Sequence, residues 1–141
     1  MQNTNDFSTK ENKIYIKGIT LGDNESLITA RLGNPNSKEE DEAADFDYLL
    51  KFNNLIIGII QNTAGVLIIE TSKDSFIDEF NAIQIGEKYK DEQDRLYLYI
   101  RQSEQVLFSQ ENDNENFRAY LTYKDNNIDF SPNNRNLTKL N

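Results

Sequence analysis

The stretch that decides the fold runs from residue 55 to residue 71 and reads LIIGIIQNTAGVLIIET. Two apolar runs rich in β-branched residues, 55–60 and 66–71, flank a polar turn signal at 61–65. Continuous apolar runs of this length are typical of strands that are buried on both faces. We therefore predict a β-hairpin in the core of the protein. Gly58, inside the first run, indicates a bulge or the close approach of another element.

A short helix is predicted before this hairpin, over residues 25–32. Asp23 or Asn24 can cap its N-terminus, because an Asp or Asn side chain accepts hydrogen bonds from the free backbone N–H groups of the first turn. Gly33 can end the helix, and Pro35 follows where a helix cannot continue. A strand over 14–16 is expected to precede this helix.

The second half of the chain resembles the first half at a fixed offset. Ile83-Gln84-Ile85-Gly86 repeats the pattern of Ile19-Thr20-Leu21-Gly22, and the offset between them is 64 residues. This offset predicts a second helix over 87–96. It also places a second hairpin, 117–130, in a position equivalent to the first hairpin.

The predicted fold class is α+β, with two tandem β-α-β-β-like units whose helices pack on a mostly antiparallel sheet. The two related halves are expected at about 14–74 and 75–131 and to form a single domain over 14–131. The polar stretches 1–13 and 132–141 are expected to be flexible tails.

The composition excludes several kinds of chemistry. The chain contains no Cys and no His, so disulfides, thiolate nucleophiles, Cys/His zinc sites and histidine general bases are ruled out. Among its 24 acidic residues, no pair is marked out for acid–base catalysis. We therefore expect a protein that is not an enzyme, with no catalytic residue, cofactor or metal ligand.

The charge restricts the classes of partner. A net charge of −9 argues against nucleic acid, because binding to a phosphate backbone requires a basic surface. No segment has the roughly 18 consecutive apolar residues of a membrane span. The remaining partners are a protein or a cell-wall polymer, and the charge favours a basic one or serves solubility alone.

Two groups of residues are candidates for binding a partner. An acidic run can contact a basic partner or form a solvated loop. Tyrosines on the predicted strands 96–100 and 117–123 can form an interface, because tyrosine gives a large contact area at a small entropic cost, or they can cover the core. The candidate residues are Glu39, Glu40, Asp41, Glu42, Tyr97, Tyr99 and Tyr120.

The sequence also resembles a known family. Gly18-Ile19-Thr20-Leu21-Gly22-Asp23, and a helix closing in Leu32-Gly33-Asn34-Pro35, are similar to the opening of the CAP-associated N-terminal domain, which precedes the CAP module in exported proteins of Gram-positive bacteria. The similarity continues through 48–59 and 83–86. More loosely, the repeated pattern resembles β-lactamase-inhibitor-protein-like modules of bacterial lipoproteins and immunity proteins.

The resemblance implies an extracytoplasmic accessory domain of a cell-envelope protein, secreted or membrane-anchored, that binds a protein or a cell-wall partner. It implies no catalytic residues, and a CAP module or membrane anchor would lie outside this chain. The alternative is a cytoplasmic, acidic immunity or inhibitor protein that neutralises a basic toxin or enzyme.

Overall fold

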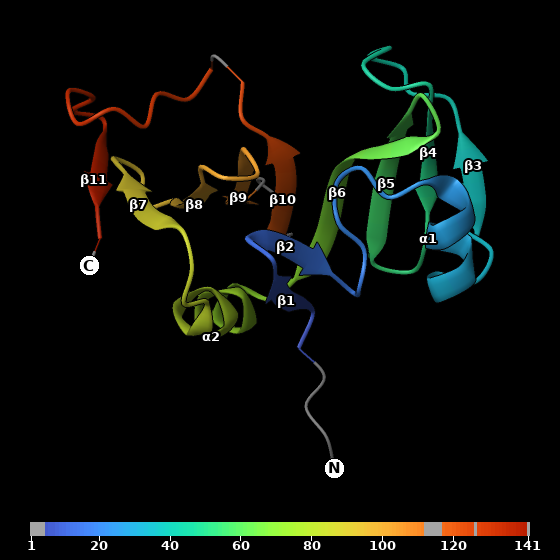
Figure 1. Cartoon of the computed structure of the whole chain (residues 1–141), viewed down its shortest axis with the longest axis horizontal. Coiled ribbons are helices and arrows are strands. Elements are labelled where there is room, and N and C mark those ends of the chain that lie inside the picture. Colours follow the sequence, from blue (N-terminus) through green and yellow to red (C-terminus); the bar gives the residue numbers. More distant parts are fainter. Residues whose placement is uncertain (1–4, 112–116, 126, 141) are drawn as a thin grey trace.

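The computed structural model describes residues 5–111, 117–125 and 127–140. Within these ranges the chain forms two helices and eleven strands (Figure 1). The elements are β1 (Phe7–Lys10), β2 (Lys13–Ile16), α1 (Glu25–Leu32), β3 (Ser37–Glu39), β4 (Tyr48–Lys51), β5 (Leu55–Ile60), β6 (Thr63–Thr71), α2 (Lys73–Ala82), β7 (Glu87–Asp91), β8 (Leu96–Ile100), β9 (Gln105–Glu111), β10 (Phe117–Tyr123) and β11 (Leu137–Lys139).

One nine-stranded antiparallel sheet organises the chain. Its order is β11-β7-β8-β9-β10-β6-β5-β4-β3, and β1 and β2 form a separate hairpin. Helix α1 is followed by the meander β3–β6, and α2 is followed by the meander β7–β10. The last strands of the two meanders, β6 and β10, pair at the centre of the sheet. The fold is therefore mixed, mainly antiparallel sheet with a helix before each meander.

The hairpin predicted from residues 55–71 is confirmed as β5 and β6. Ile57 lies opposite Leu67, and the register shifts between Gly58 and Ile59, where the sequence indicated an irregularity. The turn residue Gln61 has a φ of 50°. Both strands lie inside the sheet, since β6 also pairs with β10 and β5 also pairs with β4.

Helix α1 occupies the predicted residues 25–32. The backbone N–H of Leu27 donates to the side chain of Asn24 at 2.8 Å, which identifies Asn24 as the capping residue. Gly33 ends the helix with a φ of 81°, a left-handed conformation that glycine adopts without a steric penalty. The local sequence signals therefore determine both ends of α1.

The second predicted helix, 87–96, is wrong. Residues 87–91 form β7, in which Tyr89 is buried between two more exposed neighbours, and β8 begins at Leu96. The second helix is α2, which Ser72 caps by accepting from the backbone N–H of Ser75. Phe76 and Phe80, four residues apart, form its buried face. The two helices begin at residues 25 and 73, an offset of 48 instead of 64.

The second predicted hairpin, 117–130, is also wrong. Its first strand exists as β10, but β10 pairs with β9 and β6 and not with residues 128–130. The segment 128–130 is irregular. Phe130 is buried instead against the aromatic rings of Tyr89 and Tyr99. The two meanders thus meet through their last strands, an arrangement that no local turn signal encodes.

Both predicted tails contain ordered structure. β1 lies within 1–13, and its Phe7 is only 6% exposed. The Phe7 ring contacts the Phe76 ring edge-on, with 5.8 Å between their centroids. At the other end, β11 pairs with β7 inside the segment 132–141. Residues 1–4 and 141 lie outside the described part of the chain.

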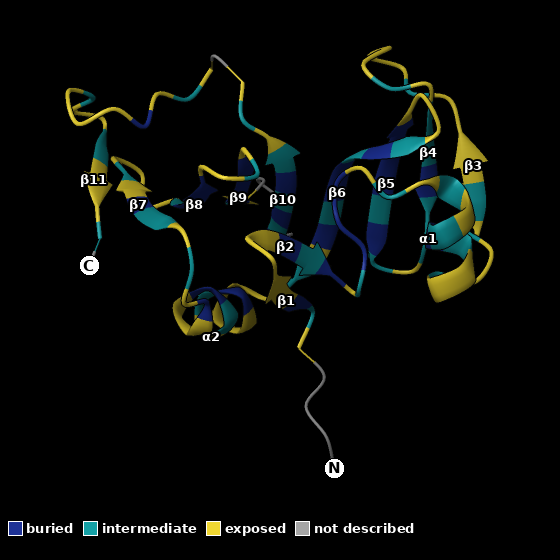
Figure 2. Ribbon diagram, viewed as in Figure 1, coloured by how far each residue is buried: buried dark blue, intermediate teal, exposed yellow. Residues whose placement is uncertain are grey.

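A row of directly opposed aliphatic residues forms the centre of the core. The residues come from six neighbouring strands, β4-β5-β6-β10-β9-β8, and all are fully buried: Leu50, Ile57, Leu67, Leu121, Leu107 and Leu98. Their face of the sheet is covered by Ile28 of α1, by Phe76 and Phe80 of α2, and by Ile14 and Ile16 of β2. Figure 2 shows the buried residues concentrated in the inner strands, with exposed residues on β3 and the loops.

Replacing Phe76 with alanine should lower the free energy of unfolding by about 3–5 kcal/mol, because the ring is fully buried among other aromatic rings. The half-buried neighbour Ile77 is the matched control, and Ile77→Ala should cost clearly less. Urea unfolding followed by circular dichroism measures both. Equal losses would contradict the position of α2 described above.

Candidate binding surface

The second face of the sheet, called the open face here, is defined by the alternation of side chains along each strand. On β10, Ala119 and Leu121 are buried on the helix side, so Arg118, Tyr120 and Thr122 point to the open face. The strand register extends this assignment to all nine strands. No described helix lies on this face, because both helices contribute their buried residues to the core on the other side.

A single row of opposed residues crosses the whole open face. It follows the register of every neighbouring strand pair from β11 to β3. Its members are Lys139, Tyr89, Tyr97, Phe108, Tyr120, Ile68, Ile56, Lys51 and Ser37. Directly opposed residues on one face touch each other, so the row forms a continuous strip of side chains.

The middle of this strip is a stack of aromatic rings. The centroids of Phe108 and Tyr120 are 5.1 Å apart, with 8° between their planes. Tyr97 stacks on the other side of Phe108 at 5.9 Å and 21°. Such offset stacks stabilise the side chains in fixed orientations. The stack therefore fixes three rings on β8, β9 and β10, of which Phe108 and Tyr120 are partly exposed.

Four residues of the strip form what we call the apolar row: Phe108, Tyr120, Ile68 and Ile56. Each is partly exposed. Tyr120, Ile68 and Ile56 do not belong to either hydrophobic cluster of the described residues. The apolar row crosses three strand-to-strand spacings, roughly 14 Å. It is an apolar strip at the surface of a protein with a net charge of −9.

The adjacent row of the open face is covered at both ends. Near β8, the ring of Phe130 stacks on Tyr99 with a centroid distance of 4.6 Å. Near β5, the ring of Phe46 lies against Gly58, where a Cβ atom would be 2.8 Å from Phe46 Cγ and 2.7 Å from Val66 Cγ1. Glycine at 58 thus makes room for Phe46. The segments that carry Phe46 and Phe130 border the apolar row at its two ends.

The loop before β4 is held together by one of the acidic candidates. The carboxylate of Asp41 accepts hydrogen bonds from the backbone N–H groups of Ala43, Asp45 and Phe46, at 2.9 to 3.2 Å. These bonds shape the loop and place Phe46 over the sheet. Asp41 therefore has a structural role inside the chain.

The other acidic candidates differ from Asp41. Glu39 forms an ion pair with Lys51, with 3.0 Å between Glu39 Oε1 and Lys51 Nζ, and its pKa is lowered by hydrogen bonds from Lys51 and Ser37. Glu40 and Glu42 are exposed. Glu39, Glu40, Asp41 and Glu42 therefore do not form one cluster. Within the described residues, the side chains of Glu39 and Asp41 form bonds inside the chain, and those of Glu40 and Glu42 do not.

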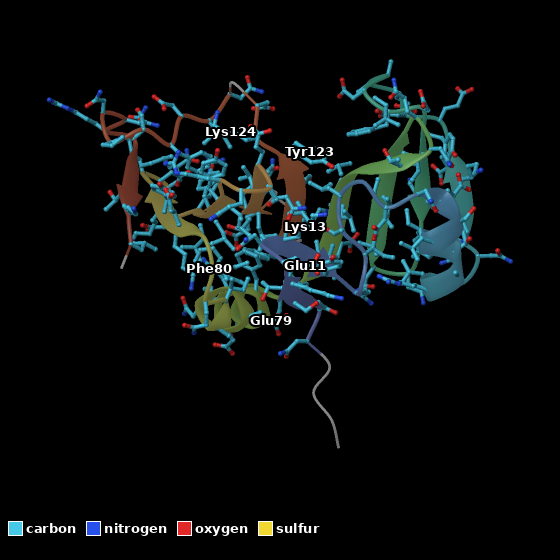
Figure 3. All side chains as sticks on the ribbon, viewed as in Figure 1. Glu11, Lys13, Glu79, Phe80, Tyr123 and Lys124 are labelled. Carbon is cyan, nitrogen blue, oxygen red and sulfur yellow. The ribbon has the colours of Figure 1, made fainter. Side chains whose placement is uncertain are left out.

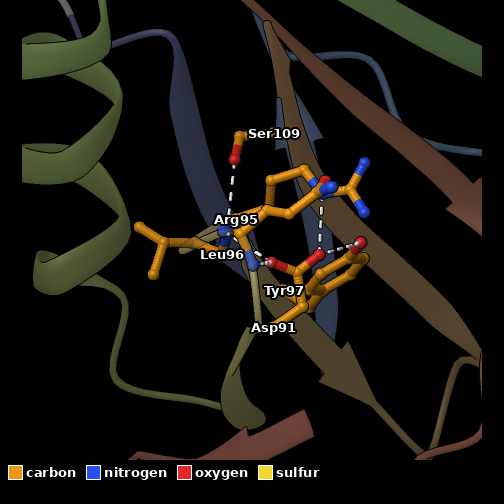
Figure 4. A network of polar contacts seen from close by, with 6 residues as sticks. Asp91, Arg95, Leu96, Tyr97 and Ser109 are labelled. Carbon is orange, nitrogen blue, oxygen red and sulfur yellow. Dashed lines mark hydrogen bonds and ion pairs between the residues drawn. The ribbon is translucent and has the colours of Figure 1, made fainter. Parts of the chain in front are cut away.

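A polar network closes the β7–β8 turn next to the open face (Figure 4). The Asp91 carboxylate accepts from the backbone N–H groups of Gln93 and Arg95, from Arg95 Nε at 2.7 Å and from the hydroxyl of Tyr97 at 3.2 Å. Burial raises the pKa of Asp91, but these hydrogen bonds outweigh burial and the pKa lies below its usual value. Burial raises the pKa of Tyr97. The hydroxyl of Tyr97 therefore stays protonated at neutral pH and acts as a donor.

A hollow of about 220 Å³ adjoins Phe108. Its lining is apolar or aromatic at Val106, Phe108, Tyr123 and Ile128 and polar at Thr122, Lys124, Asp125 and Asn127; Figure 3 labels Tyr123 and Lys124. This volume is below the roughly 300 Å³ at which small-molecule sites begin. The hollow is thus suited to one bulky side chain of a partner.

The structure separates the three predicted tyrosines. All point to the open face, but Tyr97 and Tyr99 are only 8% and 6% exposed, so neither offers a free surface. Tyr120 alone is part of the apolar row. Phe108, Ile68 and Ile56 were missed as candidates. The alternation in 105–111 marks Phe108, whereas the runs around Ile56 and Ile68 are apolar at every position and do not reveal which residues face outward.

Two kinds of feature were sought in the part of the chain that the structure describes: a cluster of metal ligands and a membrane-spanning helix. No three of its Asp and Glu residues are grouped so that they could hold a metal ion. Neither of its helices is long and apolar enough to cross a membrane.

Comparison with known proteins gives no relative. No family model, no curated protein and no solved structure matches this chain.

Replacing Asp91 with asparagine should lower the free energy of unfolding at pH 7 by about 1–3 kcal/mol, because the ionised hydrogen bonds of the turn are lost. Since folding lowers the pKa of Asp91, its contribution is present at neutral pH and is lost as the pH falls through the folded value, below 3.8. Urea unfolding at pH 7 and at pH 3 should therefore show a smaller difference between the two proteins at pH 3. Glu92→Gln, an exposed change in the same turn, should match wild type at both.

Replacing Gly58 with alanine should lower the free energy of unfolding by about 1–3 kcal/mol, because the added methyl group collides with Phe46 and Val66. The loss should be smaller when Phe46 is already alanine, and a double-mutant cycle by urea unfolding measures this coupling. Additive effects would show that Phe46 does not rest on Gly58.

Proposed function

We propose that this chain is a non-catalytic binding domain and that the open face of its sheet holds a protein partner. The apolar row carries the proposal. Partly exposed aromatic and aliphatic side chains lie in register across four strands, and no described element covers them. Contiguous apolar surface of this kind marks interaction sites in folded proteins.

The composition of the row favours a protein over a cell-wall glycan. Ile68 and Ile56 make up half of it, and aliphatic carbon offers no hydrogen bonds to the hydroxyl groups of a sugar ring. The apolar side chains of a protein partner form no hydrogen bonds with water, so they lose none when they contact this aliphatic surface. The aromatic half, Phe108 and Tyr120, supplies rigid contact area of the type that dominates protein interfaces.

The setting that we propose for this binding rests on the sequence resemblance. A relative of the CAP-associated domain would act outside the cytoplasm as an accessory domain of a cell-envelope protein. The alternative is a cytoplasmic immunity or inhibitor protein that neutralises a basic toxin or enzyme. The exposed carboxylates of Glu40 and Glu42 in the loop before β4 favour this alternative, because a basic toxin or enzyme would be attracted to them.

We also propose that the two halves of the chain are tandem units of common origin. The order of a helix followed by a four-stranded antiparallel meander occurs twice, with the helices 48 residues apart. Under this proposal each unit supplies half of the apolar row: Ile56 and Ile68 come from the first and Phe108 and Tyr120 from the second. The binding surface then exists only where the two units join.

Replacing Tyr120 with serine should weaken partner binding at least tenfold and leave the fold intact, because Tyr120 lies in the centre of the row and outside the core. Tyr15→Ser is the matched control. Tyr15 is also partly exposed, but it lies on β2, on the opposite side of the sheet. The immobilised wild type and the two variants are compared for proteins retained from envelope and cytoplasmic extracts of the source cells, with circular dichroism as the folding control.

The comparison has two decisive results. A protein retained by wild type and Tyr15→Ser but lost with Tyr120→Ser would support binding on the open face, and its extract would indicate the compartment. Equal retention by all three proteins would contradict the proposed surface.

A further inference from the structure

We propose that the partner segment is basic and extended, and that it combines one bulky apolar side chain with a Lys or Arg about four residues away. This inference rests on the proposed function and specifies the chemistry of the occupant of the open face. It follows from three features of that face: the apolar row, the hollow beside Phe108 and the charge of the loop at the other end.

The hollow fixes the position of the apolar side chain. It opens between Phe108 and Ile128, with Val106 in its lining, and its 220 Å³ accommodates a single large side chain. A side chain bound there contacts the outer part of the Phe108 ring, whose two faces are occupied by Tyr97 and Tyr120. The anchor of the partner therefore lies over β9, at the end of the apolar row near Lys124, Asp125 and Ile128.

The loop before β4 fixes the position of the charge. Residues 37–47 contain six carboxylates and one lysine, a net charge of −5 out of the −9 of the whole chain. Phe46 holds this loop against Gly58 and Val66, two residues along the strands from Ile56 and Ile68, or roughly 7 Å. Glu40 and Glu42 are exposed and flank Asp41, whose carboxylate accepts from the backbone N–H of Phe46, so this loop brings negative charge to the Phe46 end of the face and attracts a cationic side chain there.

The charge of the row itself is balanced. Next to Tyr120 and Ile68, Arg118 pairs with Glu70 at 3.4 Å. At β4, Lys51 pairs with Glu39. The loop therefore contributes the excess charge near the row, and the complementary surface is apolar in the middle and positive at one end. An acidic or uniformly apolar segment would not match this arrangement.

The spacing follows from the sheet. From β9, where the hollow lies, to β5, where Phe46 rests, there are three strand-to-strand spacings, roughly 14 Å. An extended peptide covers this distance in about four residues, at about 3.3 Å per residue. A partner strand that crosses the face therefore places its apolar anchor about four positions from the residue that reaches Phe46, and we assign the basic residue to this end because the acidic loop carries Phe46.

A random dodecapeptide library displayed on phage and selected on the whole chain tests this inference. We expect enriched peptides that carry Phe, Trp, Tyr, Leu or Met about four positions from a Lys or Arg. Synthetic peptides from that set are then measured by fluorescence anisotropy. Binding should weaken at least tenfold with Tyr120→Ser, should not change with Tyr15→Ser, and should weaken as the salt concentration rises.

A pair of double variants isolates the loop charge. E40Q/E42Q removes two exposed carboxylates from the loop before β4 and leaves Asp41 to hold the loop. E11Q/D78N removes two exposed carboxylates from the β1–β2 turn and from α2. The first should weaken peptide binding several-fold and reduce its salt dependence, and the second, with the same net charge, should match wild type.

The outcomes separate this inference from the proposed function. Binding that is lost with Tyr120→Ser but insensitive to E40Q/E42Q, or enriched peptides without basic residues, would overturn the basic partner and leave the open face as the binding surface. Binding that is insensitive to Tyr120→Ser would overturn both. A selection that enriches no sequence would overturn the extended peptide as occupant.

Discussion

The pairing of β6 with β10 is the constraint on which the rest of the structure depends. It is the only ladder that joins the two meanders within the described sheet. Its register places Leu121 opposite Leu67, which closes the fully buried row of the core. The same register places Tyr120 opposite Ile68 on the other face. Because neighbouring residues of a strand point to opposite faces, a shift by one residue would exchange the core row and the apolar row.

The two faces of the sheet are therefore determined together, but they are covered differently. The helices and the N-terminal hairpin cover one face continuously, with Phe76 at the centre of the contact. The other face is covered at its two ends, by Phe46 on one side and by Phe130 with Ile128 on the other, and each group is held by a loop. What stays uncovered is the strip between these groups. The aromatic half of this strip is rigid, since stacking holds the rings of Phe108 and Tyr120 in fixed orientations.

The sequence predicts the elements whose signals are local. It does not predict the pairings that depend on contacts between residues far apart in the chain. Asn24 and Gly33 define α1, and the turn at 61–62 defines the central hairpin, so both were found. The prediction of a helix over 87–96 rests on a 64-residue offset between similar short sequences, whereas the stronger local signal, Ser72 with Phe76 and Phe80, marks α2. The pairing of β6 with β10 has no local signal. For that reason Tyr120 could be named as a candidate, but its neighbours in the row, Ile68 and Ile56, could not.

The outermost strands of the large sheet have a further consequence. β3 and β11 are three residues long, and each contains a lysine, Lys38 and Lys139. A short, charged border strand offers few free backbone groups to another chain, so it discourages the sheet from growing by edge-to-edge association. Without such border strands, a broad sheet with an uncovered open face would be prone to associate with other copies through its edges. If the open face holds a partner as proposed, such borders direct the partner to the side chains of that face and not to main-chain pairing at its edges.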